Sequence, residues 1–315
     1  MTLKELGEFG LIDRIRQGIR LPEGVLGIGD DCAILPQKDG IDTLVSTDML
    51  VEGSHFLLSG ISSYDLGWKS AAVNISDLAA MGARPVASFL SLALSPEVDA
   101  EWMDEFIRGY RDISDKYSCA LLGGDTTASR KLVCINVAVL GEVPSGKAKL
   151  RSTACKGDLI CVSGFLGDSA AGLRLILESE DGPACLLEKH RRPEPRVAEG
   201  MELCSDPGVH AMMDISDGIA SDLRHILKAS GRGAVIDTRK IPVSSALHDY
   251  CSAKGLDALE LALCGGEDYE LLFTVSPEAE KRLKLKHFVI GRIEGPAETL
   301  RFEGTDKDYL GFRHF

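Results

Sequence analysis

The sequence has few aromatic residues and no excess of basic ones. Only 6% of its 315 residues are Phe, Trp or Tyr, and 48 Asp and Glu outnumber 35 Lys and Arg, for a formal net charge of −13. Such a charge repels a phosphate backbone, and the low aromatic content leaves little for base stacking, so a general nucleic-acid-binding protein is disfavoured. A phosphate-bearing substrate would need metal ions or local donors to offset the same charge.

Paired cysteines, long apolar runs and the common nucleotide-binding motifs are also missing. The nine cysteines include no C-x-x-C pair, which indicates reduced thiols rather than a disulfide or zinc framework. Uncharged stretches such as residues 86–96 are shorter than the roughly 20 residues of a membrane-spanning helix. The sequence contains no P-loop, no G-x-G-x-x-G after a strand and no kinase-like H-R-D or D-F-G. With no signal-peptide core near Lys4, Glu5 and Glu8, we expect a soluble cytoplasmic protein without membrane contact.

Strands and helices are predicted in both halves of the chain. Apolar runs predict strands over residues 42–49, 86–94, 120–122, 132–140, 159–162, 211–215, 234–236, 271–275 and 288–290. Caps and apolar stripes predict helices from Thr2, from Ser62 to Leu78, after Pro96, over 168–177, near Pro195 and over 218–229. The run 132–140 is nearly all apolar, which predicts a strand covered on both faces.

The predicted elements indicate the α/β (α+β) class, with mixed sheets covered by helices. A polar, basic connection over residues 144–156 separates two groups of elements. The sequence therefore predicts two domains, residues 1–145 and residues 146–315.

Aspartates occur repeatedly where predicted strands end or turn. Asp48, Asp125 and Asp214 each end a strand-like run, and Asp217 follows the last of these. Asp30 and Asp31 follow two glycines, and Asp77 lies on an apolar helix. Ligands of α/β sheets gather at the carboxyl ends of strands, and Mg²⁺ prefers carboxylate oxygens. The pattern predicts a magnesium site.

Each aspartate also has an ordinary structural explanation. Asp217 could cap the following helix, and Asp125 could stabilise a turn after two glycines. Asp77 is harder to explain in this way, because a carboxylate among Ile75 and Leu78 is costly to bury without a partner. One shared site explains the set better than five separate coincidences.

Six motifs, taken in order, resemble the thiamine-monophosphate kinase family. That family belongs to an ATP-binding superfamily with aminoimidazole ribonucleotide synthetase, selenophosphate synthetase and the hydrogenase-maturation dehydratase. The motifs are GIGDDCA (27–33), STDMLVEGSHF (46–56), NISDLAAMGARP (74–85), GGDTT (123–127), MDISDG (213–218) and GGEDYELLF (265–273). The aspartate motifs are shared across the superfamily in looser form, whereas the segments VEGSHF (51–56) and GGEDYEL (265–271) point to this family.

The resemblance implies a two-domain aminoimidazole ribonucleotide synthetase-like fold and a homodimer. The N-terminal domain would bind ATP and metal and dimerise, and the C-terminal domain would complete the nucleotide and substrate site. The implied activity is ATP-dependent phosphorylation of thiamine monophosphate to thiamine diphosphate, the last step of thiamine diphosphate biosynthesis, with several Mg²⁺ ions and ATP as co-substrate.

The resemblance also implies roles for individual residues. Metal ions would be held by Asp30, Ser46, Thr47, Asp48, Asp77, Asp125, Asp214 and Asp217. ATP would contact Tyr110, Gly124, Asp125, Arg151 and Ser216. Thiamine monophosphate would contact His55, Glu267 and Phe312. Family members often carry Trp and then Asp where this chain has Phe312 and Arg313, and Tyr110 also fits a helix stripe that predicts core packing.

The predicted reaction requires no general base. The nucleophile is a phosphate oxygen whose second pKa is about 6, so it is largely ionised at pH 7. Metal ions that neutralise two anions and align them supply most of what phosphoryl transfer needs. We expect direct in-line transfer without a phosphoenzyme. Two alternatives are a ligase that uses the same nucleotide site and a metal- and nucleotide-sensing protein without turnover.

Overall fold

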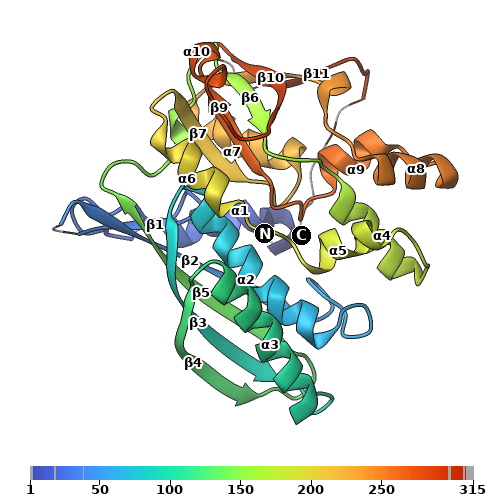
Figure 1. The fold of residues 1–315 in the computed structure, drawn as a ribbon. Helices are drawn as coiled ribbons and strands as arrows, with labels where there is room; N and C mark the ends of the chain where they lie inside the picture. The colour runs from blue at the N-terminus through green and yellow to red at the C-terminus, as the bar shows by residue number, and fades with distance from the viewer. Residues whose placement is uncertain (1–2, 18, 38, 297–298, 308, 310–315) are drawn as a thin grey trace.

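Each half of the chain forms its own mixed β-sheet, with helices packed against it (Figure 1). The computed structural model describes residues 3–17, 19–37, 39–296, 299–307 and 309. The last strand of the first sheet ends at Pro144 and the first strand of the second begins at Leu159. The division at residue 145 remains a prediction within that interval.

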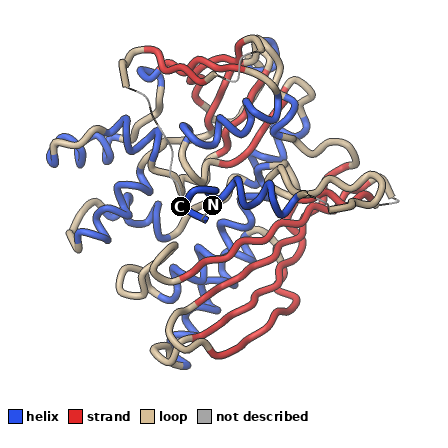
Figure 2. The backbone as a smooth tube through the Cα atoms, turned by 180° about the vertical axis from the view of Figure 1, so that it is seen from behind, coloured by secondary structure: helices blue, strands red, loops and turns tan. Residues whose placement is uncertain are grey.

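The first sheet has the strand order β1-β2-β5-β3-β4. Only β3 and β4 pair in parallel. Helices α2 and α3 cover one face, whereas Figure 2 shows no helix over the central strands of the other face. The elements of this half are α1 (Leu3–Arg16), β1 (Ala33–Pro36), β2 (Ile41–Val51), α2 (Ser63–Ala80), β3 (Arg84–Leu94), α3 (Ala100–Lys116), β4 (Ala120–Ala128) and β5 (Cys134–Pro144).

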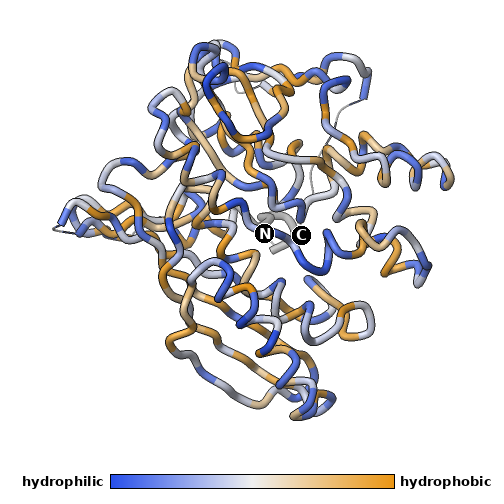
Figure 3. Tube along the Cα trace, viewed as in Figure 1, coloured by the Kyte–Doolittle hydropathy of each residue, from blue (hydrophilic) through white to orange (hydrophobic). Residues whose placement is uncertain are grey.

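The second sheet has the order β11-β8-β10-β6-β9-β7. Its strands are β6 (Leu159–Val162), β7 (Val209–Asp214), β8 (Gly233–Asp237), β9 (Leu271–Val275), β10 (Phe288–Glu294) and β11 (Leu300–Glu303). Its helices are α4 (Asp168–Glu178), α5 (Ala184–Arg191), α6 (Val197–Ser205), α7 (Ile219–Ser230), α8 (Ser245–Lys254), α9 (Ala258–Cys264) and α10 (Pro277–Glu280). Short 3₁₀ turns, η1 (Arg151–Thr153) and η2 (Thr238–Lys240), lie in the connections. In Figure 3 hydrophobic residues follow the strands of both sheets.

Helix α2 packs against its own sheet and also against elements of the second half. The hydroxyl of Ser62 accepts a hydrogen bond from the Asp65 N–H (3.0 Å) and caps its first turn, as the sequence predicts. A Cβ at Gly67 would lie 1.9 Å from the Phe106 carbonyl oxygen, so only glycine lets α3 approach this closely. At the other end α2 contacts α6 and β7 of the second half. Residues near its C-terminus therefore lie between the two sheets.

Three expectations about strands are wrong. Asp48 lies inside β2 and Asp125 inside β4, because pairing with the neighbouring strands continues past both residues. Of the three aspartates expected at strand ends, only Asp214 ends its strand. Within one chain, strand β5 is covered on one face only: its residues alternate between buried and half-buried, because helices cover one face of the sheet.

None of the helices in the described part of the chain is long and apolar enough to cross a membrane.

Candidate active site

Carboxylates of three aspartates from distant parts of the sequence meet between the two sheets. Oxygens of Asp31, Asp77 and Asp214 all lie within 4.8 Å of one another. Asp31 precedes β1, Asp77 lies near the C-terminus of α2, and Asp214 ends β7. The two sheets thus contribute to one acidic cluster, which we define as Asp31, Asp77 and Asp214.

Hydroxyl groups orient two of these carboxylates. Ser46 on β2 donates a hydrogen bond to Asp77 Oδ2 (2.5 Å), and Ser76 on α2 donates to Asp214 Oδ2 (2.5 Å). The Asp48 N–H donates to Asn74 Oδ1 (2.9 Å), which ties β2 to α2 beside the cluster. The two short bonds from Ser46 and Ser76 to carboxylates hold the oxygens of Asp77 and Asp214 in fixed directions.

Arg151 joins the aspartates to the connection between the two halves. Its guanidinium Nη2 lies 2.5 Å from Asp31 Oδ1, and its backbone N–H donates to Asp30 Oδ2 (3.1 Å). A third contact of 3.7 Å joins Arg151 Nε to Asp30 Oδ1. One cation therefore neutralises part of the acidic charge and holds the GIGDDCA segment against η1.

One arginine is too little positive charge for this group of carboxylates. Burial, followed by repulsion from Asp31, raises the pKa of Asp30 to about 7. The same two causes raise the pKa of Asp214 to about 7, whereas burial and repulsion from Asp48 raise that of Asp77 well above its usual range. The carboxylates repel one another in a poorly solvated site, and a divalent cation would relieve that repulsion.

A second set of charges lies beside the cluster, on the loop before β9. Glu267 Oε1 lies 3.0 Å from Nζ of Lys69, and its Oε2 lies 3.2 Å from Nδ1 of His190. Burial alone would raise the pKa of Glu267, but Lys69 and then His190 hold it below its ordinary value. His55, whose Nδ1 accepts the Val51 N–H (3.0 Å), also acts electrostatically on Glu267.

The backbone of this loop is left-handed at several positions, two of them not glycine. Gly266 has φ +67°, Glu267 +54° and Tyr269 +48°. Non-glycine residues in this region cost free energy and persist where their surroundings hold them. The Glu267 N–H donates to the Ser216 carbonyl oxygen (2.7 Å), and the Tyr269 N–H donates to that of Ile215 (2.9 Å). The loop is thus anchored to the residues that follow Asp214.

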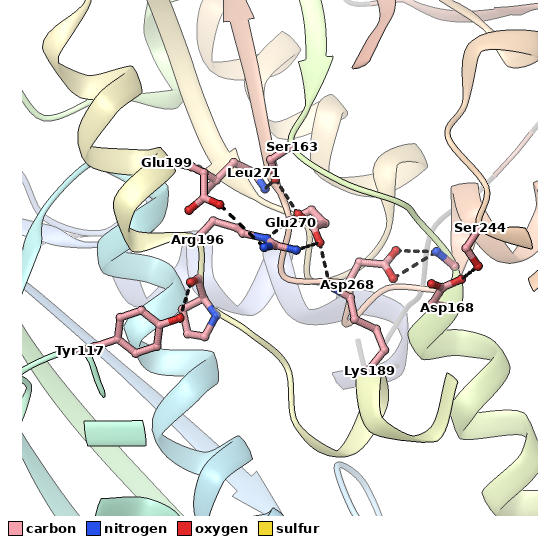
Figure 4. A network of polar contacts seen from close by, with 12 residues as sticks. Tyr117, Ser163, Asp168, Lys189, Arg196, Glu199, Ser244, Asp268, Glu270 and Leu271 are labelled. Atoms are coloured by element: carbon pink, nitrogen blue, oxygen red, sulfur yellow. Dashed lines mark hydrogen bonds and ion pairs between the residues drawn. The ribbon is translucent and has the colours of Figure 1, made fainter. Parts of the chain in front are cut away.

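Glu270, a second carboxylate of the loop, is held by its own set of polar side chains (Figure 4). Glu270 is 1% exposed, and it accepts bonds from Ser163 Oγ, Lys189 Nζ and Arg196 Nε, each at 2.7 Å. Lys189 and His190 are neighbours on α5, so one turn of helix holds both Glu270 and Glu267. A cavity of about 610 Å³ lies over the Glu270 contacts, and no carboxylate of the acidic cluster lines it.

The comparisons with known proteins all point to one family, and together they extend over nearly the whole chain. Residues 29–143 match the family described as AIR synthase related protein, N-terminal domain, and residues 156–299 match its C-terminal domain. The chain is 42% identical to the thiamine-monophosphate kinase of Escherichia coli K12 over 331 aligned positions, covering 98% of each protein. The chain belongs to the thiamine-monophosphate kinase family.

Two further comparisons extend this result. The thiamine-monophosphate kinase of Aquifex aeolicus is 37% identical over 319 aligned positions and 100% of both chains. A solved structure described as AaThiL complexed with AMPPCP and TMP superposes with a TM-score of 0.91, at 36% identity, over 100% of this chain and 99% of that one. The predicted family, two-domain fold and enzyme class are confirmed.

Most of the metal ligands expected from the family resemblance come together in the structure. Asp30, Ser46, Asp48, Asp77 and Asp214 lie at or beside the acidic cluster. Asp217 is close by, with its N–H donating to Asp222 Oδ2 (3.2 Å). Of the expected ATP contacts, Arg151 lies at the cluster and Ser216 follows Asp214.

Four expected site residues lie elsewhere in the described chain. Tyr110 is fully buried, and its hydroxyl donates to Ser88 Oγ (2.9 Å), so its contact with ATP stays a prediction. Thr47 lies on the helix-free face of the sheet, because side chains alternate along β2 and Ser46 faces α2. Gly124 and Asp125 lie on the edge strand β4.

Asp125 is separated from the acidic cluster by the sheet itself. The strand register leads from Asp125 on β4 to Ser91 on β3. From there it leads to Asn136 on β5 and then to Met49 on β2, next to Asp48. Three strand spacings amount to about 14 Å, and all four residues lie on the helix-free face. The predicted contact with Phe312 concerns a residue outside those described.

The ligand set implied by the family resemblance left out Asp31, and sequence reasoning missed Asp222, Lys69 and His190. Asp222 is 1% exposed on α7, and burial followed by repulsion from Asp217 raises its pKa well above the usual range. Asp222 and Lys69 both interrupt an apolar helical stripe, which is the signal that identified Asp77. The same test applied to every charged residue of a predicted helix would have found both.

Proposed function

We propose that this kinase transfers the γ-phosphoryl group of ATP directly to the phosphate of thiamine monophosphate, with the acidic cluster as the metal-binding centre. The observation that carries the proposal is the convergence of Asp31, Asp77 and Asp214 from both halves of the chain. A structural relative described as a complex with AMPPCP and TMP supports the choice of substrates.

The residues present fit Mg²⁺. The cluster offers the hard carboxylate oxygens that this ion prefers, on two half-buried residues and one buried residue whose charges repel one another. Asp30, Asp31, Asp48, Asp77 and Asp214 would hold the ions. When bound, Mg²⁺ would neutralise part of the charge on the phosphates.

Arg151 would bind the triphosphate once the metal ions satisfy its carboxylate partners. Its guanidinium contacts Asp31 and Asp30 at the end of the connection between the two halves. A planar donor fork suits phosphate oxygens as well as carboxylates, so the same group serves ATP without a large movement. The position of Arg151 thus supports the ATP contact expected from the sequence.

Glu267 and His55 would bind the second substrate. Glu267 is ionised and oriented by Lys69 and His190, and it lies on the loop anchored beside Asp214. A fixed carboxylate beside the cluster suits a cationic thiazolium and orients the ring while the phosphate enters the metal centre. The incoming phosphate is already ionised, so the reaction requires no general base.

A dimer through the first sheet would complete the site. The helix-free face exposes Leu35, Met49 and Phe89, with Met49 58% and Phe89 41% accessible. A large apolar sheet face is a typical surface for two-fold pairing with a second copy. Asp125 is exposed on the same face, so it would reach a metal centre across the dimer rather than in its own chain. The acidic charge and unpaired cysteines are consistent with a cytoplasmic location.

The direct experiment incubates the protein with ATP, Mg²⁺ and either thiamine or thiamine monophosphate, and identifies the products by mass. We expect thiamine diphosphate from the monophosphate and no product from thiamine, because an alcohol nucleophile needs a base. ATP and Mg²⁺ binding without product would favour a sensor instead. Labelled phosphoprotein formed from γ-labelled ATP during turnover would contradict direct transfer.

A further inference from the structure

Three side chains of different chemistry meet at the end of β7 opposite the acidic cluster. Ligand atoms of Cys155, Asp158 and His210 all lie within 4.8 Å of one another. His210 is the second residue of β7 and Asp214 is the last. Four residues of extended strand place the two groups about 13 Å apart. The thiol, carboxylate and imidazole therefore form a centre of their own.

Cys155 and Asp158 come together because they begin and end one tight turn. The Asp158 N–H donates to the Cys155 carbonyl oxygen (3.1 Å), and Gly157 within the turn has φ +94°. The Cys155 N–H donates to Asp158 Oδ2 (2.9 Å), which holds that carboxylate over the turn. Ligands separated by two residues of a glycine-containing turn are the usual arrangement in small zinc sites. Here the second cysteine of such a pair is replaced by an aspartate.

His210 supplies the third ligand from a separate element. Its Nδ1 lies 2.9 Å from both carboxylate oxygens of Asp158, and its carbonyl oxygen accepts the Thr153 hydroxyl (2.6 Å). Asp158 is 2% exposed, whereas Cys155 is exposed and His210 is half-buried. The anchored ligands thus lie on the protein side and the thiol on the solvent side, where an ion can enter and a water can complete four-fold coordination.

An ion pair explains only part of this arrangement. It accounts for Asp158 and His210, whereas the Cys155 thiol beside them makes a long hydrogen bond of 3.6 Å to the Thr153 carbonyl oxygen and is not part of the ion pair. A thiolate, an imidazole and a carboxylate together favour a borderline-soft ion such as Zn²⁺ over Mg²⁺, which prefers oxygen alone. The chemistry of the three donors is therefore different from that of the acidic cluster.

We propose that Cys155, Asp158 and His210 form a second metal site, which takes Zn²⁺ and is separate from the magnesium centre. Binding replaces the thiol proton of Cys155 by a sulfur–zinc bond and releases that proton to solvent. The bound ion would tie the turn that follows η1 to the start of β7, and η1 itself begins with Arg151. The site does not depend on the kinase activity.

Cobalt titration tests the proposal, because Co²⁺ is a coloured substitute for Zn²⁺. The full-length protein is first freed of metal and then placed in excess Mg²⁺, so that Mg²⁺ occupies the acidic cluster. Co²⁺ is then added stepwise. We expect one equivalent of Co²⁺ to give a near-ultraviolet thiolate-to-cobalt band and the visible bands of tetrahedral Co²⁺. Added Zn²⁺ should displace the Co²⁺ and abolish these bands. Loss of a partner outside the coordination shell already costs about 10–100-fold in affinity, so Cys155→Ser and His210→Ala should each weaken binding at least about 100-fold.

Cys185→Ser is the matched control, because Cys185 is the other exposed cysteine of the described chain. That variant should keep the thiolate band and its stoichiometry. Unfolding temperatures measured without added transition metal establish that each variant is folded. The proposal is overturned if the wild type shows no thiolate band at one equivalent of Co²⁺, or if the band survives in Cys155→Ser.

Discussion

The ammonium of Lys69 lies 3.0 Å from Oε1 of Glu267 and joins α2 to the loop before β9. Lys69 is 1% exposed, so this ion pair is formed almost out of water. It links the two halves of the chain at the residue that we assign to the second substrate. Because a buried charge without its partner is costly, the pair constrains both the relative position of the halves and the geometry of the site.

Replacing Lys69 by Met should destabilise the protein and weaken substrate binding. Loss of the ammonium partner of the buried Glu267 carboxylate should lower the free energy of unfolding by about 3 kcal/mol. Loss of its orientation should raise KM for thiamine monophosphate about tenfold, the effect of one hydrogen bond to a charged group, with KM for ATP unchanged. Urea unfolding and steady-state kinetics measure the two effects.

Two further variants distinguish the effect of losing this ion pair from the effect of losing any lysine. In the double variant Lys69→Met/Glu267→Gln the buried charge is gone, so part of the stability should return. Lys240→Met removes an exposed lysine and should change neither quantity by much. A Lys69→Met protein as stable as the wild type would mean that the pair does not hold the two halves together.

Replacing Asp77 by Asn should stabilise the metal-free protein and abolish turnover. The substitution removes one of three mutually repulsive carboxylates. Without divalent ions we expect a gain of about 1–2 kcal/mol, the size of one pKa unit of repulsion. Added Mg²⁺ should raise the unfolding temperature of the wild type more than that of the variant.

Thermal unfolding with and without Mg²⁺, together with a kinase assay, checks this prediction. Asp104→Asn, on the exposed side of α3, is the matched control and should behave as wild type in every measurement. Equal stabilisation of Asp77→Asn and wild type by Mg²⁺, with normal turnover, would remove Asp77 from the metal centre.

His190 should make the stability fall as the solution becomes more acidic. Burial, followed by the nearby charge of Lys69, lowers the pKa of His190 to about 4. An unfolded histidine titrates near pH 6.5, so between these values the unfolded chain binds more protons and is favoured as pH falls. From pH 8 to pH 5 this histidine alone should lower the free energy of unfolding by about 2 kcal/mol.

The contribution is measured as the difference between wild type and His190→Gln in urea unfolding at several pH values. Glutamine does not titrate, so the difference between the proteins should shrink by that amount between pH 8 and pH 5, while contributions of the aspartates cancel. His248→Gln, at an exposed position of α8, is the control. A difference that is constant with pH would mean that the pKa of His190 is the same in the folded and unfolded chains.

A mixing experiment should show whether Asp125 acts across a dimer. Asp77→Asn and Asp125→Ala should each be inactive as homodimers. If each site takes Asp77 from one copy and Asp125 from the other, a mixed dimer contains one intact site. Random mixing should then restore about a quarter of wild-type activity. No recovery after subunit exchange would place both residues in a site formed by one chain.

The same interface should be sensitive to charge on its apolar face. Phe89→Glu places a carboxylate among apolar side chains of the helix-free face, and it should shift sedimentation from dimer to monomer without loss of secondary structure. Leu177→Glu, at an exposed apolar position of α4, should leave the dimer unchanged. A dimer retained by Phe89→Glu would direct attention to another surface.

Local chemistry was readable from the sequence. Short-range patterns predicted β6 and β9 with the bounds that the structure has, and Ser62 caps α2 as expected. The placement of Asp77 in an apolar helix was enough to predict a shared acidic site, because the cost of burying a carboxylate does not depend on the rest of the fold. The motifs were also enough to predict the family.

Only the tertiary structure decided which of these residues meet. Ser76 reaches Asp214 across 138 positions of sequence, and strand order puts Asp125 on the opposite face of the sheet from Ser46. Lys69 and Glu267 meet because α2 packs against both halves of the chain. Strand pairing and helix packing are non-local, so residue type and spacing could identify the acidic side chains but not the face or the partner of each one.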